Sequence, residues 1–306
     1  MAAVFDPDVI AQAWECEISR QNEATRGGRG FALVDCGQMS QAELAWLDAQ
    51  QGFNLFVGTP DEEHAHLGPR LLALPVGNIA VPGWLQRLAM AEAREPCVHW
   101  IWTTEPEQGL ILRLQSLFIG KLEKNGRSAI IRYFDRAVWQ FLAGHLNDIQ
   151  KARFFAPARV WQTWSVDGWV AHPGQASSAP LDLSEPLLWA DTQVYRINLA
   201  GLPMQLFDDL QHDYPDHLDA SNRREMEQRF AKAVEKADAW GIVTYRDFML
   251  FTILSFTIAP EFDQHPQVAA QLQRIRHNGL KLYDIVDDVP RSAWADLGAP
   301  ARSDMY

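Results

Sequence analysis

Cysteine is scarce in this chain of 306 residues. There are three, Cys16, Cys36 and Cys97, an odd number with wide spacing and no C-x-x-C pair. Disulfide frameworks and cysteine-based zinc sites need cysteines in sets with short, regular spacings. We therefore expect three reduced, mostly buried thiols, as in a protein of the cytosol.

Long apolar runs are also missing. The longest, Phe248 to Ile258, is about half of the ~20 residues that a helix needs to cross a bilayer. It predicts a buried helix instead. The first residues, Met1-Ala2-Ala3-Val4-Phe5-Asp6, have neither the basic start nor the apolar run of a signal peptide. We expect a cytoplasmic protein with no membrane partner.

Basic residues are fewer than acidic residues. The 27 Lys and Arg residues stand against 39 Asp and Glu, which gives a formal net charge of −12. Nucleic acids and anionic membranes both favour a basic face, so neither is expected as a partner. An acidic surface suits a protein partner with basic patches.

Familiar catalytic and metal-binding motifs do not occur. There is no G-x-S-x-G elbow and no H-E-x-x-H. Gly27-Gly28-Arg29-Gly30 precedes a predicted strand and lacks the Gly-Lys-Ser/Thr ending of a phosphate loop, so we interpret it as a flexible turn. His64 and His66 cannot share one helix face, and no third ligand lies nearby. We expect no metal, no cofactor and no catalysis.

What the chain does have is the balance of a soluble globular protein, with 47% hydrophobic and 22% charged residues. Its length favours two domains. Strands alternate with helices early in the chain, which predicts an α/β domain with a mixed sheet and flanking helices, followed by an all-α helical domain. The predicted segments are an α/β domain over 1–172 with its core at 28–160, a Pro/Ser/Ala-rich connection over 173–199, a helical domain over 200–289 and a frayed tail over 290–306.

Several local signals support these domains. Ser40 and Glu43 form a capping box at the start of a predicted helix. Residues 118–123 and 128–132 predict a hairpin, because Asn-Gly between them is a strong turn signal. In the helical domain, one apolar stripe runs from Met226 to Ala237 and another from Val268 to Val286.

The most distinctive stretch is Ile130 to Asp135, where a strand breaks into a helix. We interpret Asp135 as the N-cap of that helix, with a local ion pair to Arg132. The alternative is an acid–base pair between Asp135 and a distant histidine, His145 or His172. Spacing alone does not bring those groups within hydrogen-bond reach.

Tryptophan is abundant, with 12 residues. Trp100 and Trp102 share one side of a predicted strand over 97–103, and with Trp139 they are most simply core. Four more lie in or beside the irregular middle, where a small hairpin is predicted at Asp167-Gly168. Exposed aromatics there would form a contact patch, so both core packing and partner binding stay open. These four candidate partner-binding residues are Trp161, Trp164, Trp169 and Trp189.

Taken in order, several segments resemble the effector-chaperone (adaptor) family of bacterial type VI secretion systems, the Tap or Tec proteins. The resemblance covers roughly residues 30 to 160. The segments that carry it are Phe31-Ala32-Leu33-Val34-Asp35, Leu55-Phe56-Val57-Gly58-Thr59-Pro60, Pro69-Arg70-Leu71-Leu72, the hallmark Arg132-Tyr133-Phe134-Asp135, Gln150 and Phe154-Phe155-Ala156-Pro157. Two features depart from the family pattern: Arg136-Ala137 stands where Pro-Arg is usual, and Gln115-Ser116 replaces more basic residues after Arg113.

The resemblance implies a cytoplasmic, non-catalytic bacterial adaptor that binds a toxic effector and helps load it onto the VgrG spike. Its partners would be the effector and VgrG. Two rival functions remain open, a hydrolase that uses Asp135 with a histidine and a structural subunit of a secretion assembly. The sequence leaves the oligomeric state open.

Overall fold

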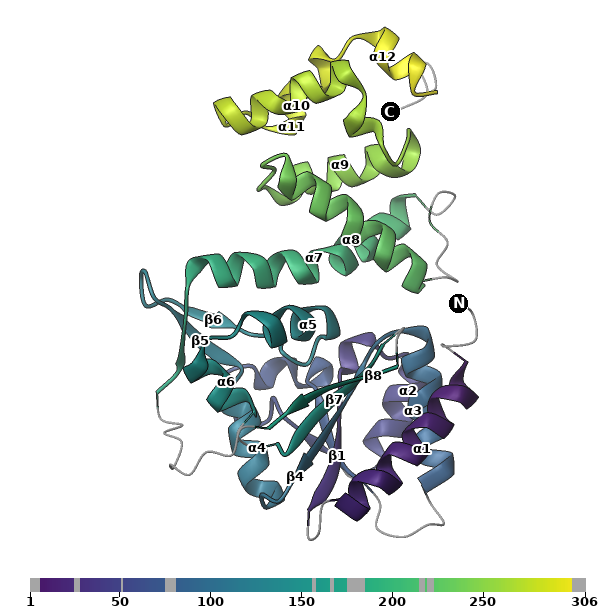
Figure 1. The fold of residues 1–306 in the computed structure, drawn as a ribbon, viewed down its shortest axis with the longest axis vertical. Coiled ribbons are helices and arrows are strands. Elements are labelled where there is room, and N and C mark those ends of the chain that lie inside the picture. Colours follow the sequence, from purple (N-terminus) through teal and green to yellow (C-terminus); the bar gives the residue numbers. More distant parts are fainter. Residues whose placement is uncertain are drawn as a thin grey trace. The chain divides into compact units, whose positions relative to one another are not determined.

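The computed structural model describes residues 6–24, 28–50, 52–74, 81–155, 158–165, 168–174, 185–214, 218 and 223–298. The chain divides into two compact units, Met1–Asn198 and Leu199–Tyr306. The first contains sheets with flanking helices, and the second is all-helical (Figure 1). The predicted fold class is therefore confirmed.

The first unit is built on a six-stranded sheet. The strands follow the order β2-β3-β1-β4-β7-β8, and every neighbouring pair is antiparallel. Their bounds are β1 (Arg29–Val34), β2 (Phe53–Asn54), β3 (Arg70–Ala73), β4 (Val98–Thr103), β7 (Val160–Ser165) and β8 (Gly168–Pro173). The hairpin predicted around Gly168 is the β7–β8 pair, and Gly168 has a positive φ of 94°.

Both faces of this sheet are buried at its central strands, which is why β1 and most of β4 are apolar on both sides rather than alternating. Ala32 and Val34 pack with α1 (Pro7–Ala24), α2 (Gln41–Asp48) and α3 (Val81–Arg94). Phe31 and Leu33 point to the opposite face, toward α4 (Glu107–Ser116), α5 (Arg136–His145) and α6 (Asp148–Phe155). Figure 1 shows these two helical layers on either side of the sheet.

A second, three-stranded sheet lies on the α4–α6 side and contributes to the same core. It contains β5 (Ile119–Leu122), β6 (Ser128–Ile130) and β9 (Leu187–Trp189) in the order β6-β5-β9. The predicted β5–β6 hairpin is confirmed, with Gly126 in its turn at φ 66°. The β5–β9 pair is parallel, so this smaller sheet is mixed.

The segment predicted as a connection over 173–199 contains regular structure. Leu187–Trp189 is strand β9, and α7 (Asp191–Asp213) begins two residues later. The prediction missed β9 because its three residues gain their hydrogen bonds from β5, about 65 residues away in sequence. Residues 175–184, the centre of the Pro/Ser/Ala-rich stretch, lie outside the described residues.

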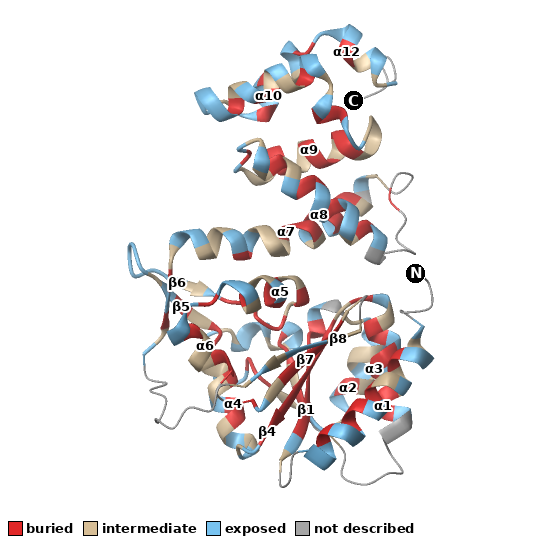
Figure 2. Cartoon of the chain, in the orientation of Figure 1, coloured by how far each residue is buried: buried red, intermediate tan, exposed pale blue. Residues whose placement is uncertain are grey.

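The second unit packs short helices around an aromatic core that includes Phe207, Phe230, Phe251 and Phe262. Figure 2 shows its helices buried along one side and exposed along the other. Its helices are the C-terminal part of α7, α8 (Arg223–Ala239), α9 (Tyr245–Thr257), α10 (Pro266–Asn278), α11 (Leu282–Ile285) and α12 (Arg291–Asp296). Within the described residues, the 3₁₀ turns are Cys36–Gln38, Glu62–Leu67, Phe262–Gln264 and Val286–Asp288.

Two details of the helical unit differ from the prediction. The apolar stripe from Val268 to Val286 is broken, because Gly279 adopts the left-handed conformation (φ 66°) and ends α10. The tail predicted to fray from residue 290 instead forms α12, which buries Ala293 in the core. Residues 299–306 lie outside the described range. Among the helices that the structure describes, none is both long and apolar enough to cross a membrane.

Candidate functional site

The hallmark segment joins β6 to α5 and is anchored by its two aromatics. Tyr133 and Phe134 are buried, and the Tyr133 hydroxyl donates to the Leu114 carbonyl at 2.9 Å. Phe154, from the later part of the motif, meets the Tyr133 ring edge-on with centroids 5.7 Å apart. Phe155 is also buried, whereas Pro157 lies outside the described residues. The aromatic part of the motif therefore forms core.

Asp135 caps α5, as predicted. Its Oδ1 accepts from the backbone N–H of Ala137 at 2.9 Å and of Val138 at 3.3 Å. These are two of the backbone donors that a helix start leaves without a partner inside the helix. The carboxylate is thus used for local structure.

The residue after the cap, Arg136, is 4% exposed and joins several elements of the first unit. Its Nη2 donates to Glu92 Oε1 at 3.2 Å and to the Val98 carbonyl at 2.6 Å, while its Nη1 donates to the Trp164 carbonyl. Glu92 Oε2 in turn accepts from the N–H groups of Cys97 and Val98, each at 2.9 Å. This buried pair ties the start of α5 to the end of α3, to β4 and to β7. The sequence showed that Arg136 stands where the family usually has proline, but it did not indicate the buried ion pair with Glu92.

His99 holds the hallmark segment from the sheet side. It is fully buried, and the indole N–H of Trp161, which can only donate, donates to His99 Nδ1 at 3.1 Å. The proton of His99 therefore sits on Nε2, which donates to the Phe134 carbonyl at 2.9 Å. Burial, helped by the charge of Arg136, holds the pKa of His99 well below its usual range, so the ring stays neutral. In the sequence, His99 is marked only as a polar residue within the otherwise apolar run 97–102.

Arg132 is the most exposed member of the hallmark, whereas Asp135 is half-buried. Its side chain is 52% exposed, and its guanidinium lies 5.6 Å from the centre of the Phe134 ring. The predicted ion pair with Asp135 is wrong. Arg132 Nη2 instead lies 4.0 Å from Asp35 Oδ2, because Asp135 turns its carboxylate toward the helix backbone.

Asp35, at the end of β1, is a buried carboxyl with incomplete hydrogen bonding. Its Oδ1 accepts from the Gly37 N–H at 3.0 Å, while its Oδ2 is buried without a hydrogen bond. Burial raises the pKa of Asp35 to about 7, and the charge of Asp135 adds to this rise, while Arg132 opposes it. A half-exposed arginine thus stands beside a buried carboxyl whose pKa is raised.

The two histidines named in the hydrolase alternative, His145 and His172, make other contacts in the structure. His145 is exposed and its Nδ1 bonds to the Phe141 carbonyl, and His172 stacks on the Phe155 ring. Asp135 makes no hydrogen bond to any histidine that the structure describes. His64 and His66 are exposed in a 3₁₀ turn. Within the described ranges, no group of three His, Cys, Asp or Glu residues is arranged to hold a metal ion.

The tryptophan patch considered for partner binding is not a surface patch. Trp161 and Trp189 are fully buried and Trp164 is nearly so. Trp161 stacks on Trp139 with ring centroids 4.1 Å apart. The α4–α6 layer buries Trp161 and Trp189, and the α1–α3 layer buries Trp164, which the irregular composition of the middle segment did not indicate. Trp169 alone of the four is half-buried, with its ring edge-on to Trp164.

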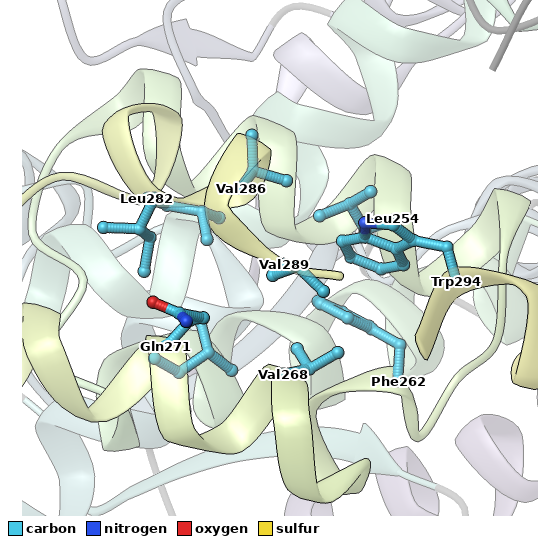
Figure 3. A pocket seen from close by; sticks show the side chains of 10 residues that line it. Leu254, Phe262, Val268, Gln271, Leu282, Val286, Val289 and Trp294 are labelled. Carbon is cyan, nitrogen blue, oxygen red and sulfur yellow. The ribbon is translucent and has the colours of Figure 1, made fainter. Parts of the chain in front are cut away.

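The helical unit contains an apolar hollow (Figure 3). Its empty volume is about 210 Å³, which includes space open to solvent. Gln271 supplies the amide seen in Figure 3, and the side chains around it, such as Leu254, Phe262 and Trp294, are hydrophobic. With so little polar lining, the hollow has few groups to orient a ligand, and its walls are the buried core of the unit.

Comparison with known families adds one finding. Residues 30–153 match DUF4123, a domain of unknown function. The DUF4123 segment runs from β1 into α6 and includes the hallmark, so it coincides closely with the region that the motifs indicated. The β7–β8 hairpin, β9 and the helical unit lie beyond it. No curated protein and no solved structure matches the chain.

Proposed function

We propose that this protein is a non-catalytic, cytoplasmic adaptor of a bacterial type VI secretion system, which binds a toxin effector and helps load it onto the VgrG spike. The observation that carries the proposal is the DUF4123 match, which falls on the segment that bears the adaptor-like hallmark. The family description names no activity, so the function rests on the resemblance of the motifs.

The chemistry of the hallmark supports a scaffold. Asp135 caps a helix, Arg136 is buried against Glu92, and the Tyr133 hydroxyl is bound within the core. Catalysis would need a proton-transfer group free to reach a substrate. Arg132 has the most exposed side chain of the hallmark, and arginine is enriched at binding hot spots.

Within this proposal, the α/β unit holds one partner and the helical unit tunes specificity. A chain lacking residues 200–306 should then keep its fold over the first unit but bind the effector less selectively or more weakly. Undiminished effector binding by the shortened chain would contradict this division.

The deciding experiment is a pull-down of the tagged protein from its native cytoplasm, with co-purifying proteins quantified by mass spectrometry. We expect enrichment of a VgrG-like spike and a toxin-like protein over a mock purification. Recovery of neither, when both are well expressed, would refute the adaptor function. Stoichiometric retention in the assembled secretion particle would instead favour the structural-subunit alternative, because an adaptor should leave after loading.

A further inference from the structure

The small sheet of the first unit has one face in the core and one face toward solvent. Strand pairing places Ile119 opposite Ile130, and Lys121 opposite both Ser128 and Leu188. Because side chains alternate along a strand, these residues share a face. We call it the outer sheet face, and it consists of Ile119, Lys121, Ser128, Ile130 and Leu188. The neighbours of Leu188, Leu187 and Trp189, point into the core.

The outer sheet face is apolar at two well-exposed positions. Ile130 and Leu188 are each 55% exposed, and Ile119 is half-buried beside them. A sheet normally buries its apolar face against another layer, as both faces of the six-stranded sheet do here. A single exposed aliphatic residue is ordinary, but two on one face of a three-stranded sheet indicate an interaction surface.

The rim of this face is basic in an otherwise acidic chain. Lys121 lies on the face itself, and Lys124 and Arg127 flank the exposed turn of the β5–β6 hairpin (Figure 2). Glu123, which is exposed in the same segment, offsets one of these three charges and leaves a net positive charge. None of the three forms an ion pair with any residue that the structure describes. The chain as a whole carries −12, so this local excess of cations favours an acidic partner over a second copy of the chain.

The spacing of the apolar positions fits a helix. Ile130 and Leu188 lie on strands at opposite edges of the sheet and are offset by two residues along the strands, because Ile130 is opposite Ile119 and Leu188 is opposite Lys121. Two strand spacings and two residues of rise place their Cα atoms about 12 Å apart. A helix rises about 10.5 Å over seven residues, so side chains at i and i+7 can contact both. A helix with acidic residues beside that stripe would also meet the hairpin cations.

We infer that the outer sheet face is a docking surface for an acidic amphipathic helix of a partner protein. The helix covers Ile119, Ile130 and Leu188 with its apolar stripe, and its carboxylates contact Lys121, Lys124 and Arg127. The inference goes beyond the adaptor function, because the surface and its chemistry stand without the secretion role.

The test uses the full-length chain and a fluorescein-labelled, 18-residue synthetic peptide of Leu, Ala and Glu whose leucines form one helical stripe. Fluorescence anisotropy should show saturable binding that weakens as salt is raised, because salt screens exposed charges. The double variant Ile130→Asp, Leu188→Asp should raise Kd at least about tenfold, which corresponds to about 1.4 kcal/mol. The double variant Lys121→Glu, Arg127→Glu should also weaken binding and reduce its salt dependence.

Three controls make the result specific. Leu112→Asp changes an equally exposed leucine (53%) on α4 and should leave the Kd unchanged. A peptide of the same composition, with its leucines spread around the helix, should bind at least tenfold more weakly, as should a peptide with Lys in place of Glu. Circular dichroism checks that the variants fold, and Ile130→Ser with Leu188→Ser serves as the second pair if the aspartates disturb the sheet.

Equal binding of the scrambled peptide, or an unchanged Kd for both outer-face pairs, would overturn the inference. So would self-association in sedimentation that the Ile130 and Leu188 substitutions abolish, because it would assign the face to a second copy. A pull-down without VgrG or toxin would refute the adaptor function while leaving the peptide result intact, so the two failures are distinguishable.

Discussion

At the scale of single residues, the first unit places ionisable groups where water cannot reach them. Arg136 with Glu92, Asp35 and His99 all lie in its interior, and each contacts the hallmark segment or the strands beside it. Their charge states should therefore show in the free energy of unfolding.

We expect Glu92→Ala to cost about 3–5 kcal/mol, because it leaves the Arg136 guanidinium buried without its counter-charge. Replacing both residues with apolar ones, Glu92→Leu with Arg136→Met, should cost clearly less than Glu92→Ala. Urea unfolding followed by far-UV circular dichroism measures the difference. Arg113→Ala, which removes a partly exposed pair with Glu105, is the matched control and should cost about 1 kcal/mol or less. A similar loss for both single variants would contradict the role of the buried pair.

Asp35 should make stability depend on pH. Its folded pKa of about 7 lies above the ordinary aspartate value of 3.8, so the folded state keeps the proton that the unfolded state releases. Its contribution to stability is fully present below about pH 3.8 and is lost as the pH rises through 7. Asp35→Asn removes this dependence. The stability gained by the substitution should therefore be larger at pH 8 than at pH 5, by about 2–3 kcal/mol. An equal gain at both pH values in urea titrations would show that Asp35 does not titrate in this window.

At the scale of elements, the packing of the small sheet requires a glycine at position 120, and no sequence motif indicates this requirement. A Cβ at Gly120 would clash with the indole ring of Trp189 on β9. Gly120→Ala should cost about 1–3 kcal/mol through overpacking and should shift the tryptophan fluorescence. Leu122→Ala, on the same strand, serves as a comparison because it removes atoms without the clash. Unchanged stability together with unchanged fluorescence in Gly120→Ala would contradict the clash with Trp189.

Elements encoded by short-range chemistry could be predicted from the sequence. The capping box of Ser40 and Glu43 is present, and the Asn125-Gly126 turn makes the β5–β6 hairpin. The cap at Asp135 likewise needs only its own helix. Strand β9 and the Glu92–Arg136 pair could not be predicted, because their partners lie far away in sequence.

The candidate site, like the fold, could be predicted only where it depends on residues close together in sequence. The hallmark gave its location, but which polar groups are exposed depends on packing. Asp35 and Arg132 meet through the fold and not through spacing, and the buried tryptophans owe their burial to layers contributed by other segments. Composition indicates that aromatics are plentiful without indicating which of them are covered.

At the scale of the whole molecule, the two units have separate hydrophobic cores. Phe230→Ala should remove about 3–5 kcal/mol from the helical unit alone. Hydrogen exchange with mass spectrometry should then show faster exchange in α8 and α9, with β1 and β4 unchanged. Phe118→Ala in the first unit should give the reverse pattern. Faster exchange in both units from either substitution would show that they unfold as one cooperative body.

The DUF4123 match ends at residue 153, before the strands β7 and β9 that pair with strands of the matched segment. Strand β4 needs β7 on one side, and β5 needs β9, and both partners follow the matched segment. During translation, a nascent chain of which only the first 153 residues have emerged therefore has two strands, β4 and β5, that each lack one hydrogen-bonding partner. Unpaired strand edges are templates for aggregation. The last strands to emerge, up to Trp189, should decide when this unit can close during translation.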